Sequence, residues 1–252
     1  MANDEVPKGI NRRELVKVGL AVGAAGVATA AGLAVLNPFF QRPSEAVPET
    51  NLIYYSQSPE PQWWDDRVGE PIRVTDFQEW QGATGHWLVT LKDGKPVTGT
   101  GMPVLVIRVK RDDSVFQAPG RDEVPLPSGF GLYYDDPIRD IRIVAVYDRC
   151  THLCCFPGWQ IVQNPPPGRD YVSDAPTYRV YGLDPIYCVC HGSQYDPMIL
   201  VKQVNPRNGV TYIGPSAVHG PSPRAIPILP LKADGDFLLG GVADPRWYVD
   251  CG

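Results

Sequence analysis

Positive charge is scarce in this sequence, and internal repeats and a glycine-rich phosphate-binding loop are missing. The 23 Lys and Arg residues are outnumbered by 28 Asp and Glu residues, so the formal net charge is −5 and the pI is near 5.4. Nucleic-acid binding requires a basic surface, which this composition does not supply, so we expect no nucleic-acid partner. The lack of a glycine-rich phosphate loop gives no support to a P-loop nucleotide-binding domain. The lack of internal repeats gives no support to a solenoid.

A long helical pattern is also missing after residue 62, and the chain is instead rich in turn residues. Its 27 prolines and 25 glycines are spread along the sequence, which is typical of many turns between short strands. Alternating and β-branched runs predict strands at 86–91, 103–110, 141–147, 186–189, 210–213 and 237–239. These patterns predict an all-β fold for the globular part.

Two turn signals and one helix signal complete the secondary-structure prediction. Asp93-Gly94 and Asp234-Gly235 each stand beside strand patterns, as in β-hairpins. Residues 75–80 predict one short helix that is capped by Thr75. The region 156–186, which contains a run of three prolines, predicts a long surface excursion.

The N-terminal residues predict an export signal and a membrane anchor. Arg12 and Arg13 precede an uncharged, Ala/Gly-rich stretch over 18–36, as in twin-arginine export signals. A helix of that length spans about 28 Å, close to the hydrocarbon thickness of a bilayer. We expect residues 1–17 to be a cytoplasmic tail and 18–36 a single transmembrane helix of the cytoplasmic membrane. The rest of the chain would then lie on the outer, periplasmic side. Cleavage as a signal peptide near 28–30 is the alternative.

A proline-rich segment over 37–62 separates this anchor from the globular part. Its prolines and its lack of apolar anchors predict an extended, semi-rigid tether. We expect the folded domain to cover 63–252. Six cysteines are many for a reducing cytosol, so they indicate metal ligation, disulfides or both.

Two short segments combine cysteine with histidine. They are 150–155, with the sequence CTHLCC, and 188–195, with the sequence CVCHGSQY. A tetrahedral metal site needs four ligands, and two loops that each provide a cysteine and a histidine can close around a metal. The residue pattern alone leaves a structural zinc site open as an alternative to iron.

The two segments resemble the paired boxes of the Rieske iron–sulfur family, C-T-H-x-x-C and C-x-C-H-G-S. In a Rieske centre, two histidines replace two cysteines on one iron of a 2Fe–2S cluster. The resemblance therefore implies this cofactor, and it covers roughly residues 63–241. The ligands that it implies are Cys150, His152, Cys188 and His191.

The resemblance also implies a disulfide, a fold and a covering loop. Cys155 and Cys190 would form the disulfide that ties the two loops together. The fold would be a Rieske-type antiparallel β sandwich base with a small inserted cluster-binding subdomain at about 148–225. Residues 220–224 resemble the proline loop that covers the cluster in this family. Residues 101–104 resemble a base-domain signature more weakly.

Several residues of the two segments take individual roles from the family. Ser193 and Tyr195 match positions whose hydroxyls donate hydrogen bonds to sulfur, which raises the reduction potential. His191, with His152 beside it, is expected to form the hydrogen bond to quinol. Leu153 is expected on the exposed tip, where it would shield the cluster and contact a partner.

These implications favour the iron–sulfur subunit of a quinol-oxidising cytochrome bc-type respiratory complex. Such a subunit takes one electron from quinol beside a cytochrome b and passes it to a cytochrome c or a similar acceptor. The small Rieske subunit of an arsenite oxidase has the same boxes and an export signal, so it is the alternative. Soluble Rieske ferredoxins and oxygenase domains normally lack the disulfide cysteines.

Two cysteines and two histidines do not fit the family pattern. Cys154 stands where the family usually has glycine, so a tight turn loses its freest residue. We hypothesise a second disulfide between Cys154 and Cys251, with two inert thiols as the alternative. His86 and His219 are each isolated in the sequence and are expected not to be ligands.

Overall fold

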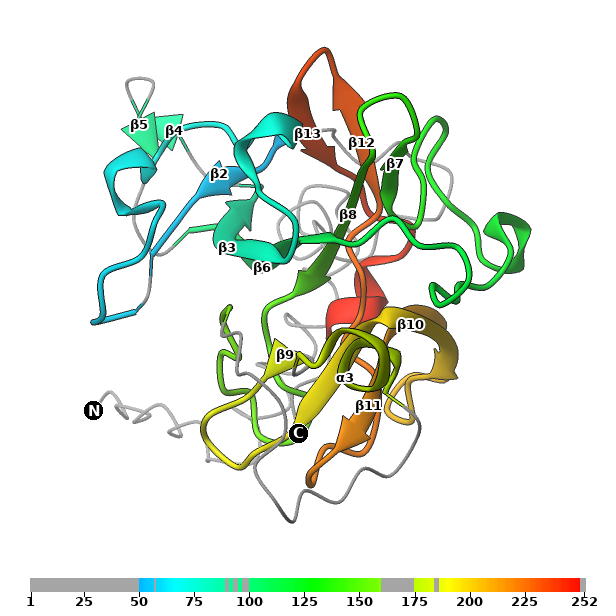
Figure 1. The fold of residues 1–252 in the computed structure, drawn as a ribbon. Coiled ribbons are helices and arrows are strands. Elements are labelled where there is room, and N and C mark those ends of the chain that lie inside the picture. The colour runs from blue at the N-terminus through cyan, green and yellow to red at the C-terminus, as the bar shows by residue number, and fades with distance from the viewer. Residues whose placement is uncertain are drawn as a thin grey trace, which may run out of the picture. The chain divides into compact units, whose positions relative to one another are not determined.

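The computed structural model describes residues 50–56, 58–88, 91–92, 95–96, 100–159, 175–183 and 186–249 (Figure 1). All of them belong to one compact unit, 46–252. The predicted tail and anchor over 1–36, and the first part of the predicted linker, lie outside the described residues. No helix among the described ranges has the length and apolar character needed to cross a bilayer.

The described fold is mostly β and its sheets are antiparallel, as the sequence predicts. The largest sheet has five strands in the order β2-β3-β6-β8-β7, and each neighbouring pair is antiparallel. Its strands are β2 (Ile53–Tyr54), β3 (Gln81–Trp87), β6 (Met102–Val109), β8 (Ile141–Tyr147) and β7 (Tyr134–Asp136).

Two three-stranded sheets and a two-stranded ribbon complete the described β structure. The sheet with the order β1-β13-β12 contains β1 (Thr50–Asn51), β13 (Phe237–Gly240) and β12 (Leu231–Asp234). The sheet with the order β11-β10-β9 contains β11 (Thr211–His219), β10 (Gln194–Val204) and β9 (Ile186–Tyr187). The ribbon pairs β4 (Leu91–Lys92) with β5 (Lys95–Pro96).

The described helices are short. The α-helix α3 (Pro176–Tyr181) begins with a proline and ends at Gly182, whose φ of 65° only glycine adopts readily. Its first turn is held by Asp196 of β10, which accepts from the Thr177 amide at 3.0 Å and the Thr177 hydroxyl at 2.5 Å. The 3-10 helices are η1 (Asp65–Arg67), η2 (Val74–Asp76), η3 (Arg121–Glu123) and η4 (Pro245–Tyr248).

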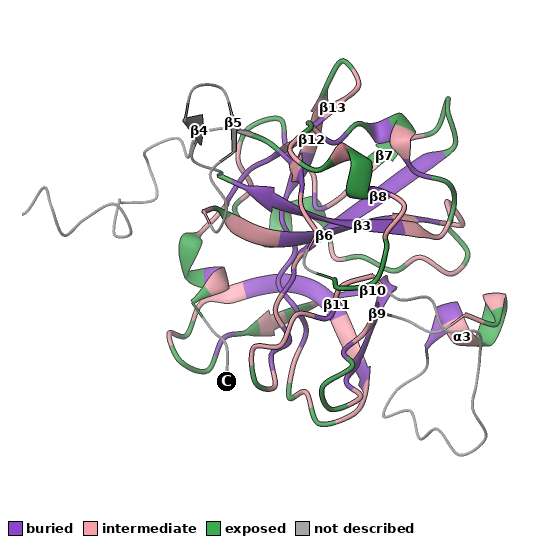
Figure 2. Ribbon diagram, turned by 90° about the vertical axis from the view of Figure 1, so that its left-hand side faces the viewer, coloured by how far each residue is buried: buried purple, intermediate pink, exposed green. Residues whose placement is uncertain are grey.

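Strands β6 and β8 are buried on both faces, which explains their continuous apolar runs (Figure 2). Leu105 lies opposite Val146, and both belong to the first of two hydrophobic clusters. Val106 lies opposite Ala145, and both belong to the second cluster. Because side chains alternate between the faces of a strand, an apolar run over every position requires cover on both sides.

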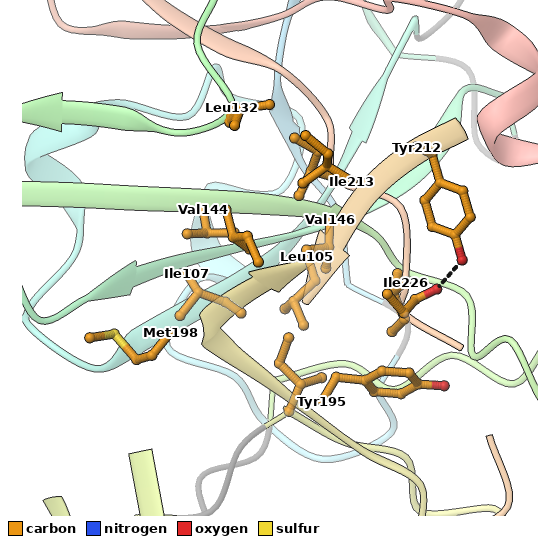
Figure 3. Packing of buried hydrophobic residues seen from close by; sticks show 14 of the residues in the cluster. Leu105, Ile107, Leu132, Val144, Val146, Tyr195, Met198, Tyr212, Ile213 and Ile226 are labelled. Carbon is orange, nitrogen blue, oxygen red and sulfur yellow. Dashed lines mark hydrogen bonds between the residues drawn. The ribbon is translucent and has the colours of Figure 1, made fainter. Parts of the chain in front are cut away.

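The first hydrophobic cluster joins the five-stranded sheet to the sheet that carries the second cysteine loop. Figure 3 shows Leu105 and Ile107 of β6 near Tyr195 and Met198 of β10, with Ile213 of β11 in the same cluster. Two of the cysteines, at 150 and 188, belong to this cluster as well. The hydrophobic core therefore extends as far as the candidate metal-binding thiols.

Several strand and turn predictions agree with the structure. The prediction over 141–147 coincides with β8, and the predictions over 103–110 and 237–239 differ from β6 and β13 by one residue at their ends. Asp93-Gly94 lies outside the described residues, but β4 and β5 on either side of it pair as a hairpin. Asp234-Gly235 forms the predicted turn, with Asp234 paired to Phe237 and Gly235 at a φ of 58°.

The longest described strand, β10, is not predicted by the sequence. Its register shifts between Asp196 and Leu200, and Pro197 interrupts the alternating pattern at the same place. A proline and a bulge both weaken the local signal of a strand, while pairing with β11 and burial maintain it in the fold. The predicted strand over 210–213 covers only the start of β11, because Pro215 interrupts the strand pattern further along.

The predicted helix over 75–80 is wrong, since only the single 3-10 turn η2 forms there. Thr75 is not its cap, because its hydroxyl donates to Asp236 Oδ2 at 2.5 Å. Asp76 Oδ2 accepts from the Tyr54 hydroxyl at 2.8 Å, and the chain becomes extended at Phe77, which is buried. These tertiary contacts outweigh a weak local helix signal.

The predicted linker over 37–62 extends too far toward the C-terminus. Strand β1 pairs with β13, and β2 pairs with β3. Leu52, between the two strands, is fully buried in the second hydrophobic cluster. Residues 50–54 therefore belong to the folded part of the chain, and the predicted boundary at 62/63 lies too far toward the C-terminus.

The substitution Leu52→Ala tests this boundary. Since Leu52 is fully buried, its truncation should lower the free energy of unfolding by about 2–5 kcal/mol. Glu60→Ala is the matched control, because Glu60 is exposed in the same predicted linker and should change stability by less than about 0.5 kcal/mol. Urea unfolding measures both. Equal midpoints for the two variants would mean that residues 50–54 are not part of the folded base.

Candidate metal centre

The first cysteine loop follows strand β8 and is closed by two backbone hydrogen bonds. The Cys150 amide donates to the Cys155 carbonyl at 2.8 Å, and the Cys154 amide donates to the Cys150 carbonyl at 2.9 Å. Cys154 has a φ of 64°, in the left-handed region. The bonds bring residue 150 and the end of the loop together, so the side chains between them project from one tight turn.

The second cysteine loop, between β9 and β10, repeats this arrangement. The Cys188 amide donates to the Ser193 carbonyl at 2.8 Å, and the Gly192 amide donates to the Cys188 carbonyl at 2.9 Å. Gly192 has a φ of 76°, at the position equivalent to Cys154. The two loops therefore share one backbone conformation, in which the fifth residue lies in the left-handed region of φ.

A disulfide joins the two loops. Cys155 and Cys190 are bonded, with their Cα atoms 6.5 Å apart and a sequence separation of 35. This is the pair that the family resemblance implies. Since each loop is only six residues long between its closing hydrogen bonds, one cross-link is enough to fix the loops against each other.

Two cysteines of the loops, Cys150 and Cys188, lie in the interior. Both residues are buried, and both belong to the first hydrophobic cluster. Interaction with the Cys188 side chain lowers the pKa of the Cys150 thiol, and the same interaction raises the pKa of the Cys188 thiol. A lowered thiol pKa favours the thiolate form that a metal ligand requires.

The two predicted histidine ligands lie together at the outer side of the loops. The rings of His152 and His191 are edge-to-face, with centroids 4.8 Å apart. His152 is half-buried, and its Nδ1 is buried without a hydrogen-bond partner among the described residues. His191 is exposed. A buried imidazole nitrogen without a partner carries a desolvation penalty that metal ligation would remove.

A group of three cysteines in the described residues has the spacing to hold a metal ion. The sulfurs of Cys155, Cys188 and Cys190 lie within 4.8 Å of one another. Cys155 and Cys190 form the disulfide, however, and a metal ligand must be a thiolate. No described histidine belongs to this group. Of the buried thiols in the two loops, Cys150 and Cys188 are therefore the ones that remain available as ligands.

Hydroxyl groups surround the Cys150 sulfur. The Tyr195 hydroxyl lies 3.1 Å from Cys150 Sγ, and the Thr151 amide donates to the Tyr195 oxygen at 3.2 Å. Burial, and then the charge of Cys150, raise the pKa of Tyr195, so the phenol keeps its proton for donation. Ser193 Oγ is buried and has no hydrogen-bond partner among the described residues.

The segment 220–224 packs directly on the second cysteine loop. Gly220 has a φ of 82°, and a Cβ built there would lie 2.6 Å from the Gly192 carbonyl oxygen and 2.7 Å from Ser193 Cα. Only glycine allows both the backbone conformation and this close approach. The proline-containing segment thus covers one side of the loops, as the family resemblance implies.

Two apolar side chains extend from the loops into solvent. Leu153, between His152 and Cys154, is 59% exposed, and Val189, between two cysteines of the second loop, is 54% exposed. Each of the two loops thus presents one exposed aliphatic side chain. Leu153 therefore lies at the surface, where the sequence analysis places it.

Two residues that support the first loop are not identified by the sequence. Asp148 is fully buried, and its Oδ1 accepts from the Gly158 amide at 3.0 Å. Burial raises the pKa of its carboxyl group to about 6. The Arg149 guanidinium donates to the Cys154 carbonyl at 3.0 Å and stacks on the Phe156 ring at 3.5 Å. In the sequence, the only indication of this support is that Asp148 and Arg149 directly precede the first box.

The remaining residues that the sequence analysis considers are not among the implied ligands. Cys154 is a free thiol in the structure, and its hypothesised partner Cys251 lies outside the described residues. His86 lies on β3 and stacks on the Tyr55 ring at 3.9 Å, and burial lowers its pKa. His219 ends β11 opposite Gln194.

No known protein-family model matches the chain, and no curated protein matches it. The resemblance to the Rieske family therefore rests on the two cysteine–histidine segments and on the loop over 220–224.

The substitution Cys154→Gly tests the shared design of the two loops. It removes the cost of a left-handed non-glycine residue, so the free energy of unfolding should rise by about 1 kcal/mol. Gly192→Ala is the matched reverse change and should lower that energy by about the same amount. A Cβ at Gly192 meets nothing closer than the Tyr187 hydroxyl at 3.9 Å, so the change reports backbone conformation alone. Chemical unfolding of the oxidised protein measures both, and a destabilised Cys154→Gly variant would contradict the interpretation.

Proposed function

We propose that this chain is a Rieske-type iron–sulfur protein that carries single electrons from a quinol. The observation that carries this proposal is the sorting of the four candidate ligands into two pairs. The two thiol groups, of Cys150 and Cys188, are buried in the first hydrophobic cluster. The rings of His152 and His191 have their centroids 4.8 Å apart on the outer side of the loops, and His191 is exposed. A single zinc ion draws its ligands around one point, whereas a Rieske centre binds its thiolates and its imidazoles on different irons.

The surroundings of the two pairs also fit this cofactor. The sulfur pair has a phenol donor from Tyr195 and a buried hydroxyl from Ser193 that lacks a partner among the described residues. Donors to sulfur stabilise the extra negative charge of a reduced centre and raise its potential. The imidazole pair has one orphaned buried nitrogen, on His152, and one exposed ring, on His191.

A Rieske cluster would supply a one-electron acceptor with a potential of roughly −150 to +300 mV. The protein would supply the rest of the chemistry of quinol oxidation. His191 is exposed, so its outward ring nitrogen can accept a hydrogen bond from the quinol hydroxyl and receive that proton. Leu153 and Val189, which are exposed on the two loops, would provide apolar surface for contact with a partner.

The proposed role assigns functions to the other parts of the chain. The five-stranded sheet and the β1-β13-β12 sheet would be the sandwich base. The segment 148–225, which contains β9, β10 and β11, would be the inserted cluster-binding subdomain. A helix over 18–36 would anchor the subunit in the membrane, with the folded domain on the outer side. A cytochrome b would adjoin the quinol site, and a cytochrome c or similar carrier would receive the electron.

Metal analysis of the natively matured full-length protein tests the proposal. It should contain iron and acid-labile sulfide in a ratio of about one to one, and the reduced protein should be paramagnetic. Electron paramagnetic resonance of the reduced sample provides the second readout. Zinc in place of iron, with no paramagnetic signal, would instead support a structural zinc site.

A ligand variant and a matched histidine control make this test specific. His191→Ala should abolish the paramagnetic signal, because it removes one of the two imidazoles. His86→Gln should retain the signal, because His86 lies on β3 and stacks on Tyr55, away from both loops. An unchanged signal in His191→Ala would contradict the ligand assignment. Co-purification with a molybdenum protein in place of a cytochrome b would identify an arsenite oxidase subunit.

A further inference from the structure

Ser222 connects the proline-containing loop to the sulfur of Cys150. Its Oγ lies 2.5 Å from the Tyr195 hydroxyl and 2.5 Å from Thr151 Oγ1. The Tyr195 hydroxyl in turn lies 3.1 Å from Cys150 Sγ. A continuous line of hydrogen-bonding groups thus runs from a residue outside both cysteine boxes to a candidate ligand.

The direction of these hydrogen bonds follows from counting protons. Thr151 Oγ1 lies 2.7 Å from the Arg224 carbonyl oxygen, and a carbonyl can only accept. The single hydroxyl proton of Thr151 is therefore used there, and its oxygen acts toward Ser222 as an acceptor. The Arg224 carbonyl is 3.5 Å from Ser222 Oγ, too far to compete for its proton with two neighbours at 2.5 Å.

The sulfur determines the direction at the other end. A cysteine that ligates a metal is a thiolate and can only accept, so Tyr195 must direct its single proton to Cys150. The Tyr195 oxygen is then an acceptor, for the Thr151 amide at 3.2 Å and for Ser222. The single proton of Ser222 therefore has two acceptors at 2.5 Å, Thr151 Oγ1 and the Tyr195 oxygen, and a titration in a Tyr195→Phe background distinguishes them. A phenol that accepts a hydrogen bond becomes a stronger donor, since linked hydrogen bonds polarise one another.

The backbone holds Ser222 in place for this contact. Pro221 and Pro223 stand on either side of it, and each ring fixes its own φ. Gly220 approaches the second cysteine loop so closely that a Cβ would lie 2.6 Å from the Gly192 carbonyl oxygen. The Ser222 hydroxyl is thus positioned by rigid neighbours, and its contact with Tyr195 needs little ordering.

We propose that Ser222 is a positioning residue that donates to Tyr195, strengthens the Tyr195–Cys150 hydrogen bond and thereby raises the reduction potential of the centre. This inference rests on the proposed iron–sulfur function. It adds a residue of the covering loop to the groups that set the potential.

The test is a redox titration of the purified, cluster-loaded full-length protein. Ser222→Ala should lower the midpoint potential, and Ser222→Thr, which keeps the hydroxyl, should restore it. In a Tyr195→Phe background, which removes the phenol, Ser222→Ala should cause no further shift. Ser114→Ala is the control, because Ser114 is exposed outside all three loops and should leave the potential unchanged.

The outcomes that would contradict the inference are as specific as the expected one. A potential of Ser222→Ala that is equal to or higher than that of the parent protein overturns the inference. An equal downward shift with and without the phenol overturns the route through Tyr195. If Ser222→Ala fails to mature, Ser222→Cys provides a weaker donor of similar size, and an unchanged potential there overturns the inference too. A parent protein without iron and sulfide would overturn the proposed function itself, which metal analysis detects before any titration.

Discussion

The site depends on one backbone arrangement that occurs twice. In each cysteine loop, the amide of the first cysteine bonds to the carbonyl five residues later, and the amide of the fifth residue bonds back to the first cysteine. This closes each loop into a tight turn. The disulfide between Cys155 and Cys190 then fixes the two turns against each other. Every contact of the candidate ligands follows from these constraints.

The hydrophobic core continues up to these turns and gives the two ligand pairs different surroundings. Cys150 and Cys188 belong to the same cluster as Leu105 of β6 and Tyr195 of β10, so the sulfurs lie in a dry environment where hydrogen bonds are strong. The imidazoles lie on the outer side of the same loops, and the ring of His191 is exposed. In the proposed function, the buried sulfurs would hold the added charge, and the imidazoles on the outer side would exchange protons with a ligand.

The sequence predicts what depends on neighbouring residues and misses what depends on distant ones. The runs that form β6 and β8, and the turn at Asp234-Gly235, have local signals and lie where they are expected. Strand β10 has no clear local signal, since it is maintained by pairing with β11 across a bulge. The contact of Ser222 with the Tyr195 hydroxyl is likewise tertiary, because the two residues are far apart in the sequence.

Cys154 stands where the Rieske family usually has glycine, and its contact with Arg149 shows how a neighbouring side chain can support an unusual residue. The left-handed backbone at Cys154 favours glycine, and the equivalent residue of the second loop is indeed Gly192. The first loop differs in having the Arg149 guanidinium, which donates to the Cys154 carbonyl and is itself held over the Phe156 ring. A charged donor on that carbonyl stabilises the turn by an amount comparable to the cost of its backbone conformation, about 1–3 kcal/mol in each case. The second loop, covered by Gly220, has the glycine and needs no such support.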